Sequence, residues 1–347
     1  MPAGERRSDA DLARLPGRRQ VRPRSGPSPR VLVLTEACDP TADFVLEHLN
    51  ERGVGFWRVD PGDFPETVDM SAEFDMSWSG QLRGPLRAID LAEVRAIYYR
   101  RPSGFRISAG LTDPERRFVE SQARHALYGL LAALPDVLWV NRPGAMADAR
   151  VKPYQLAVAA KAGLSTPRTL VTNRPEEVAA FGQRVGRIIT KSLAMVTLKD
   201  EDERTGLLYT AEMPESDWNS PGIAATAHFF QEVVPRDYEV RMTYVAGECF
   251  ATAMRPDNPA GALDIRAHSK HVSYEAIRVP AKIADPVRAM MERLGLVFGA
   301  FDFIVRPDGH WIFIELNPNG QWAWTEQAAG LPISTALADL LEKGAVA

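Results

Sequence analysis

The sequence predicts a protein of the α/β class, with an opening α/β domain followed by a longer part that mixes helices with strand pairs. A short buried strand, an amphipathic helix and a second strand over residues 30–59 indicate a β-α-β opening. The segment Asn141-Arg-Pro-Gly144 then interrupts the pattern and marks a domain boundary. The third observation is an acidic hairpin over residues 301–320, where two apolar strand-like runs flank a turn signal.

Composition sets wide limits on the class of protein. The chain has 347 residues, of which 45% are hydrophobic and 25% charged, so two or three ordinary globular domains are expected. A net charge of -4 gives no general attraction to nucleic acid or to a membrane. Cys38 and Cys249 are too few for a disulfide framework or a thiolate metal site. With no spanning segment and no secretion signal, we expect a cytoplasmic protein.

The first 29 residues differ from the rest of the chain. They carry arginines at positions 6, 7, 14, 18, 19, 22 and 24, several Pro, Gly and Ser residues, and hardly any aliphatic cluster. This composition predicts a disordered basic tail, because it cannot bury enough apolar surface to fold.

An α/β domain is expected over residues 30–140. After the opening strand, helix and strand, its elements follow in order: strand pairs over 68–89, a strand over 94–99, a long amphipathic helix over 114–134 and a closing strand over 137–140. The first strand continues Thr35-Glu-Ala-Cys-Asp-Pro40, which lacks the glycine-rich dinucleotide fingerprint. We therefore expect no NAD site, and no Walker sequence occurs elsewhere.

The next region contains a lysine in an unusual place. Helices over 152–162 and 175–185 and a strand over 169–172 precede the apolar strand 187–191, which ends in Lys191. A lysine on a buried strand needs an anion, although a strand-end lysine can also extend harmlessly to solvent. The polar segment 193–210 is typical of a flap.

Two strands follow, over residues 228–234 and 238–245. Pro235 stops the first one, so residues 231–234 form an extended segment whose backbone edge can bind a flat heterocycle such as adenine. Glu239 and Arg241 lie on one face of the second strand.

The acidic hairpin predicts a metal site. If Asp308-Gly309 forms a two-residue turn, with positive φ at both positions, Asp302 lies opposite Glu315, and Asn317 shares the face of Glu315. Two facing carboxylates repel each other unless a cation lies between them, and oxygen ligands of this kind suit Mg²⁺ together with nucleotide phosphates. The alternative is a solvated edge hairpin whose carboxylates face water.

Lysine, extended hinge and acidic hairpin occur in an order that resembles the ATP-grasp fold. The most specific piece, Glu315-Leu-Asn317-Pro-Asn-Gly-Gln-Trp322, resembles the magnesium motif of the graspetide (microviridin-type, ω-ester-containing) ribosomal peptide maturases. Three more segments resemble the same family: Tyr99-Arg-Arg-Pro102, Lys191-Ser-Leu193 and Tyr238-Glu-Val-Arg241. The resemblance covers residues 30–341, with Tyr99 standing where some relatives have Trp. Ribosomal-protein glutamate ligases fit these segments less well.

The resemblance implies a pre-ATP-grasp domain over 30–140 and two α+β subdomains, over 141–227 and 228–347, that enclose ATP. It also implies roles for individual residues. Lys152 and Lys191 would contact ATP phosphates, the backbone of Gln231, Glu232, Val233 and Val234 would contact adenine, and Glu232 or Glu239 would contact ribose. Asp302, Glu315 and Asn317 would hold Mg²⁺, while Arg241 and Arg266 would steady the transferred phosphoryl group and the acyl phosphate.

The implied activity is that of an ATP-dependent ligase. It would phosphorylate Asp or Glu side chains of a ribosomal precursor peptide and join them to Thr or Ser hydroxyls or Lys amines, making macrocycles. The N-terminal domain and residues 99–106 are candidates for binding the leader, although Arg100 and Arg101 could equally be solvated charges. Alternatives are a ligase that adds a free amino acid to a peptide or small acid, and a non-catalytic ATP-binding module. The resemblance also suggests twofold self-association.

The tryptophans near the hairpin have open roles. Trp311 alternates with Phe313, so we expect it in the sheet core. Trp322 and Trp324 follow the metal motif and could line the acceptor site or pack in the interior.

Overall fold

The computed structural model describes residues 29–194, 197–199, 205–207, 210–256 and 272–344. Residues 1–28 of the predicted tail, half of the predicted flap (195–196, 200–204 and 208–209) and Arg266 therefore lie outside the described residues. Within the described parts, every helix is too short or too polar to span a bilayer.

The N-terminal domain is built on a parallel sheet with strand order β2-β1-β6-β7. Alternate side chains of β1 enter two different cores: Val31 and Val33 pack with helix α1, and Leu32 and Leu34 pack with helix α2. The predicted β-α-β opening is confirmed, and its strands pair in parallel. The elements are β1 (Val31–Leu34), α1 (Pro40–Glu51), β2 (Phe56–Val59), β6 (Ala96–Tyr99), α2 (Asp113–Ala132) and β7 (Leu138–Val140).

A three-stranded antiparallel sheet lies against the same domain. Its strands are β3 (Asp69–Asp75), β4 (Ser77–Arg83) and β5 (Ala88–Asp90), as the strand pairs expected over 68–89 require. Leu82 and Ile89 anchor this sheet in the core that α2 covers.

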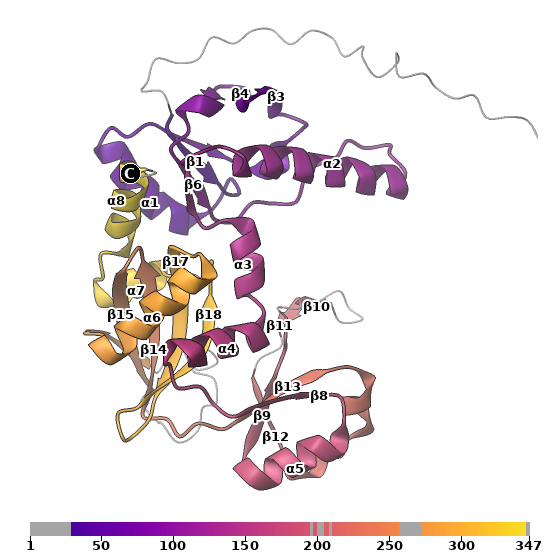
Figure 1. Cartoon of the computed structure of the whole chain (residues 1–347), viewed down its shortest axis with the longest axis vertical. Coiled ribbons are helices and arrows are strands. Elements are labelled where there is room, and N and C mark those ends of the chain that lie inside the picture. The colour runs from indigo at the N-terminus through magenta and orange to yellow at the C-terminus, as the bar shows by residue number, and fades with distance from the viewer. Residues whose placement is uncertain (1–28, 195–196, 200–204, 208–209, 257–271, 345–347) are drawn as a thin grey trace, which may run out of the picture.

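The last helix of the chain, α8 (Ile333–Lys343), packs on α1 (Figure 1). Ile333, Leu337 and Leu341 enter the core of α1 and β1. The C-terminal helix thus completes the hydrophobic core of the N-terminal domain.

The central subdomain contains an antiparallel sheet with strand order β12-β9-β13-β8, covered by helix α5. Val178 and Phe181 of α5 pack against Ile188 and Phe230 of the sheet. A separate two-stranded ribbon, β10–β11, belongs to the same stretch of chain. The elements are β8 (Thr169–Thr172), α5 (Pro175–Val185), β9 (Ile188–Lys191), β10 (Thr197–Lys199), β11 (Thr205–Leu207), β12 (Ala211–Met213) and β13 (His228–Glu232).

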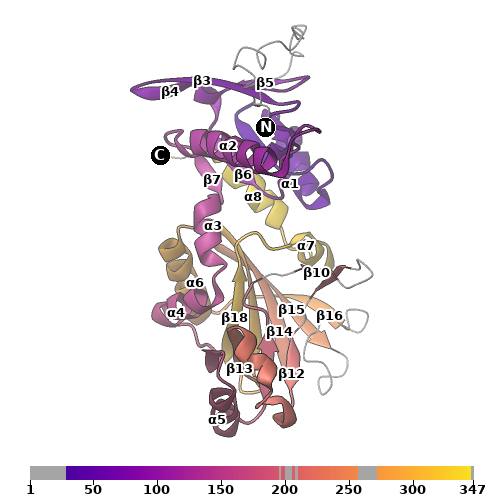
Figure 2. The same cartoon turned by 90° about the vertical axis from the view of Figure 1, so that its right-hand side faces the viewer.

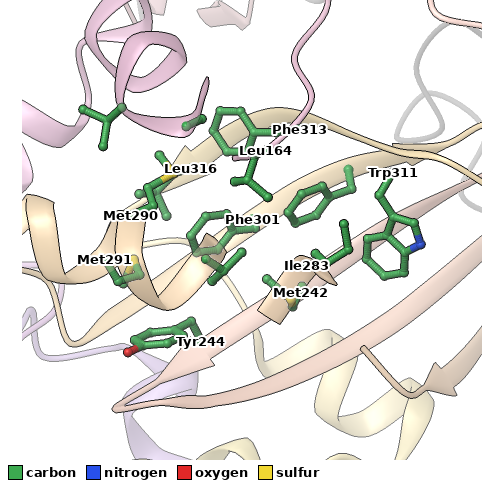
Figure 3. Packing of buried hydrophobic residues seen from close by; sticks show 14 of the residues in the cluster. Leu164, Met242, Tyr244, Ile283, Met290, Met291, Phe301, Trp311, Phe313 and Leu316 are labelled. Atoms are coloured by element: carbon green, nitrogen blue, oxygen red, sulfur yellow. The ribbon is translucent and has the colours of Figure 1, made fainter. Parts of the chain in front are cut away.

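The C-terminal subdomain is a five-stranded antiparallel sheet with strand order β16-β15-β14-β17-β18. Helices α4 and α6 cover one face, where a large aromatic and methionine core forms (Figure 3). The elements are α3 (Pro143–Ala149), α4 (Lys152–Ala162), β14 (Tyr238–Val245), β15 (Glu248–Pro256), β16 (Val272–Ile277), α6 (Ala281–Leu294), β17 (Phe298–Val305), β18 (Trp311–Asn317) and α7 (Ala323–Ala329).

The sheets divide the chain at a different place from the predicted boundary between residues 227 and 228. Strand β13 pairs with β8 and β9, so it belongs to the central sheet rather than to the C-terminal subdomain. A division by strand pairing therefore falls between Glu232 and Tyr238, in the linker that contains Pro235.

The turn of the acidic hairpin is also different from the prediction. Arg306 N donates to His310 O at 2.9 Å, and of the residues between them only Gly309 has positive φ, at 78°. The connection is a three-residue turn over Pro307, Asp308 and Gly309, which shifts the register by one residue.

A β-bulge restores the predicted pairing at the acidic residues. Phe303 pairs with Phe313, but Asp302 pairs with Glu315, so Ile314 is the extra residue on β18. Simple alternation would place Glu315 on the face of Trp311 and Phe313, which lie in the buried core. The bulge turns Glu315 to the opposite face, and the predicted opposition of Asp302 and Glu315 is confirmed.

Candidate active site

A cavity of about 440 Å³ is lined by residues of the central and C-terminal sheets. Figure 2 shows β12 and β13 of the central sheet beside β14, β15 and β18 of the C-terminal sheet. The cavity lining comes from both sheets and from the linkers at Pro167 and Val234. The lining residues are Pro167, Ile189, Lys191, Thr210, Gln231, Glu232, Val234, Glu239, Arg241, Met254, Tyr274, Asp302, Phe303, Ile304, Ile314, Glu315, Asn317 and Trp324. Nine of the predicted site residues are in this set: Lys191, Gln231, Glu232, Val234, Glu239, Arg241, Asp302, Glu315 and Asn317.

Arg241, Asp302 and Glu315 form one row across three neighbouring strands. Arg241 on β14 pairs with Asp302 on β17, which pairs with Glu315 on β18. Arg241 Nη1 donates to Asp302 Oδ1 at 2.6 Å, and the two side chains are 14% and 26% exposed. A charged hydrogen bond of this length in a half-buried site offsets part of the repulsion between the carboxylates.

The donor set fits a hard divalent cation held jointly with a nucleotide. Glu315 and Asn317 share a face of β18, and both line the cavity beside Asp302. Among the described residues, no group of three or more His, Cys, Asp or Glu side chains could hold a metal. Mg²⁺ commonly binds one or two carboxylates and completes its shell with water and phosphate oxygens, so two carboxylates and an amide oxygen suffice.

The opposite wall of the cavity carries Lys191. It ends β9, and its Nζ lies 5.4 Å from the ring centroid of Phe229 on the paired strand β13. Lys191 and the row of Arg241, Asp302 and Glu315 line the same cavity from different sheets, as a phosphate contact by the lysine would require.

The hinge segment offers less free backbone than we expected. Glu232 N donates to Arg168 O at 3.1 Å, and Val233 N donates to Arg187 O at 2.9 Å. Gln231 lies within β13, which is paired on both sides. Val233 is not part of the cavity lining, so the expected adenine edge narrows to the end of the segment, at Val234.

The two candidate ribose carboxylates have different partners. Glu232 Oε1 accepts from Arg168 N at 3.0 Å. Glu239 Oε1 accepts from Arg236 Nη1, which lies three residues earlier in the linker. Both residues line the cavity, and the choice between them stays open.

Lys152 and Arg266 are not placed in the cavity. Lys152 begins α4 and is not a lining residue, so its contact with phosphate stays a prediction. Arg266 lies outside the described residues.

The tryptophans have separate positions. Trp311 is 7% exposed and lies in the sheet core, as predicted. Trp322 is fully buried and contacts Phe44 edge-on in the core of α1 and α8, so it does not line the site. Trp324 lines the cavity, with its ring edge-on to Tyr274 at 5.5 Å.

The Arg100–Arg101 pair does not form a joint anion-binding surface. Arg101 is exposed and lies 3.9 Å from Glu36. Arg100 is 2% exposed and binds the loop after β18, so neither of the two expected roles applies to it.

Several lining residues were not predicted from the sequence. Ile189, Ile304 and Ile314 supply an apolar wall, and Met254 and Tyr274 pair across β15 and β16. Ile304 could have been found, because it alternates with Asp302 on one face of its strand. The sequence left Ile314 undecided, because alternation from Phe313 places it on the cavity face and alternation from Glu315 places it on the core face. The bulge that lets both Ile314 and Glu315 face the cavity leaves no sequence signal.

Comparisons with known proteins agree with this geometry. Residues 30–147 match the model of the MvdD pre-ATP grasp domain. Macrocyclase MdnC from Microcystis aeruginosa MRC, solved with precursor peptide MdnA, is 26% identical, with 89% of this chain and 97% of that chain covered and a TM-score of 0.78. Macrocyclase MdnB from the same organism is 29% identical, with 89% and 97% covered and a TM-score of 0.72.

A third structure shares the fold. ATP-grasp ligase PsnB, solved with minimal precursor, Mg and ADP, is 24% identical, with 89% of this chain and 96% of that chain covered and a TM-score of 0.72. No curated protein matches the chain. The matched N-terminal domain, the two facing sheets and the acidic hairpin in the cavity between them lead to one assignment. The chain has the ATP-grasp fold, and its residues 30–147 form a pre-ATP-grasp domain similar to that of the macrocyclases MdnC and MdnB.

Proposed function

We propose that the protein binds ATP and Mg²⁺ in the cavity between its two antiparallel sheets and macrocyclises a ribosomal precursor peptide. The observation that carries this proposal is the row Arg241–Asp302–Glu315 facing Lys191 in one cavity. MdnC bound to its precursor and PsnB bound to precursor, Mg and ADP support the same substrate and cofactor classes.

The first step activates an acid. A side-chain carboxylate of the peptide attacks the γ-phosphorus of ATP, the bond from that phosphorus to the β,γ-bridging oxygen breaks, and ADP leaves. Negative charge grows on the phosphoryl oxygens, and Mg²⁺ held by Asp302, Glu315 and Asn317 would neutralise part of it. Lys191 from the central sheet and Arg241 from the C-terminal sheet bind the same oxygens from opposite sides in this proposal.

The second step closes the ring. A Thr or Ser hydroxyl or a Lys amine of the same peptide attacks the carbonyl carbon of the acyl phosphate and loses its proton, and phosphate leaves. The balance is one ester or amide formed and ATP converted to ADP and phosphate. The nucleophile belongs to the substrate, so no catalytic triad is needed.

The cavity has an apolar part and an aromatic part. Val234 and the isoleucines Ile189, Ile304 and Ile314 suit a flat apolar base. Tyr274 and Trp324 lie toward the outer strand β16 and suit the peptide. Aromatic side chains of this kind bind extended peptide with little loss of side-chain entropy.

The direct test mixes purified protein, ATP, Mg²⁺ and the precursor peptide encoded beside its gene. The expected product has lost the mass of one water for each ring, and ADP appears in equal amount. A mass gain from an added amino acid would instead identify a ligase for free amino acids. If a folded sample shows no Mg²⁺-dependent nucleotide binding, the proposed function is wrong.

A further inference from the structure

The strand that carries the predicted metal ligands is held by three buried polar side chains from other elements. These side chains, Arg100, Asn141 and Gln155, are only 2%, 2% and 3% exposed. Each binds backbone or side-chain atoms of residues 316–321, directly after Glu315 and around Asn317. We call these three residues the clamp.

Gln155 of α4 holds Leu316, which lies between two metal ligands. Its Oε1 accepts from Leu316 N at 2.9 Å, and its Nε2 donates to Leu316 O at 2.8 Å. The same Nε2 donates to Ala149 O at 2.5 Å. The amide therefore occupies the place where a further strand would pair with β18, and it satisfies both backbone groups of one residue.

Asn141 joins the end of β18 to the start of β17. Its Nδ2 donates to Pro318 O at 2.9 Å and to Phe298 O at 2.8 Å. Its Oδ1 accepts from Val297 N at 2.9 Å and Phe298 N at 3.2 Å. All four hydrogen-bonding positions of this amide are used, so the residue after Asn317 has one fixed location.

Arg100 of the N-terminal domain binds the next part of the loop. Its Nη1 donates to Asn319 Oδ1 at 3.0 Å, and its Nη2 donates to Gln321 Oε1 at 2.6 Å. Asn319 Nδ2 donates back to Arg100 O. Asp39, 1% exposed, lies 3.8 Å from Arg100 Nε and balances the buried charge.

The loop fits closely against the sheet. A Cβ added to Gly320 would lie 2.4 Å from Ala300 Cβ and 3.1 Å from Asn317 Cβ, so glycine is needed for this approach. Ala300 is the residue that pairs with Asn317. A shift of the loop would therefore move Asn317 directly.

Buried charges and amides rarely add net stability compared with apolar side chains of similar size. They fix one arrangement, because each group must keep its partners or remain unsatisfied in the interior. We propose that Arg100 is a positioning residue of the metal site, which acts with Asn141 and Gln155 to aim Glu315 and Asn317 into the cavity. This inference rests on the proposed function, because it assumes that those residues bind Mg²⁺.

The test compares Arg100→Lys with Arg101→Lys. Lysine keeps the charge beside Asp39 but loses the fork that binds Asn319 and Gln321 together. The neighbouring Arg101 is 52% exposed in its side chain and serves as the matched control. Loss of a residue that orients a metal ligand typically weakens metal affinity about 10- to 100-fold.

For Arg100→Lys we expect the Mg²⁺ concentration at half-maximal ADP binding, measured by calorimetry, to rise about tenfold. ADP binding in EDTA should equal that of the wild type, since the adenine wall is untouched. Arg101→Lys should match the wild type in both conditions. Gln155→Glu, which loses both donated hydrogen bonds, should shift the Mg²⁺ dependence in the same direction.

Two results would overturn the inference while leaving the proposed function intact. One is an unchanged Mg²⁺ dependence in folded Arg100→Lys; the other is an equal loss of ADP binding with and without Mg²⁺, which indicates a general structural role. If Arg100→Lys does not fold, Gln321→Met is measured in its place; it keeps Arg100 but removes the oxygen that accepts from Arg100 Nη2 and Thr41 Oγ1. A wild-type protein without Mg²⁺-dependent ADP binding would refute the proposed function itself.

Discussion

At the scale of single residues, the site depends on charges that the strands place side by side. Asp302 and Glu315 face each other, and Arg241 Nη1 donates to Asp302 Oδ1 at 2.6 Å. The arginine lowers the cost of the acidic pair before any ligand binds. A cation bound between the two carboxylates would attract both of them and remove their repulsion. An uncharged amide of the same size cannot replace either carboxylate in this role.

Glu315→Gln and Asp302→Asn should each abolish Mg²⁺-dependent turnover while the fold is kept. Removal of the charge leaves the side-chain volume unchanged but loses an anionic ligand, and we expect a decrease in rate of at least about 100-fold. ATP hydrolysis and peptide mass loss measure the effect. Glu248→Gln, an exposed carboxylate on β15, is the control, and full activity in either site variant would show that the metal ligands lie elsewhere.

The two cysteines should differ in reactivity. Burial raises the pKa of the Cys249 thiol to about 11, whereas Cys38 is exposed. The thiolate is the nucleophile, so Cys249 should react far more slowly with iodoacetamide at pH 8. Peptide mapping after timed alkylation should find label on Cys38 first, and unfolding in urea should make the two rates similar. Equal rates in the folded protein would contradict the burial of Cys249.

At the scale of elements, the acidic hairpin combines two departures from regular geometry. A three-residue turn shifts the strand register by one, and the bulge at Ile314 shifts it back before Glu315. The bulge also separates Glu315 from the face of Trp311 and Phe313, which fill the core in Figure 3. One irregularity thus lets a single strand supply both core residues and ligands.

Gly309→Ala should destabilise the protein by about 1 kcal/mol, because its φ of 78° is unfavourable for a residue with a Cβ. No atom lies within 4 Å of the added Cβ, so backbone conformation alone sets the cost. Urea unfolding gives the free energy. Gly104→Ala, which also has open space but no positive φ, should leave it unchanged; equal stability of all three proteins would argue against this turn.

At the scale of the whole molecule, helices α1 and α8, which are far apart in the sequence, pack together. Figure 1 shows α8 beside α1, and side chains of α8 complete the core of the N-terminal domain. Arg100 and Asn141 from that region bind the loop after β18. The N-terminal domain is therefore not an independent attachment. Its position is tied to the strand that carries Glu315.

Leu337→Ala should lower the free energy of unfolding by about 2–5 kcal/mol, because the side chain is fully buried between α8 and α1. Loss of near-UV signal from Trp322, which lies in the same core, should accompany the transition. Lys343→Ala, at the exposed end of α8, is the control. A cost below about 1 kcal/mol would mean that the helix docks only weakly.

Much of this fold could be predicted from local pattern. The β-α-β opening, the strand ending in Lys191 and the acidic hairpin were all located within a few residues, because side-chain periodicity and turn residues are local properties. The facing of Asp302 and Glu315 was also correct, although it arose from a turn and a bulge that compensate each other. The prediction placed β13 in the C-terminal subdomain, whereas the strand pairs in the central sheet. Pro235 shows where the strand ends but does not show which strands it pairs with.

The sequence by itself determined which chemistry is present: oxygen ligands on one hairpin, a lysine at the end of one strand and a hinge between two sheets. Only the tertiary structure decided that Trp322 is interior, that Trp324 lines the cavity and that Arg100 binds the loop after β18. The physical reason is distance along the chain. Arg100 and Gln321 are 221 residues apart, and a buried contact between them depends on the packing of whole domains rather than on any local preference.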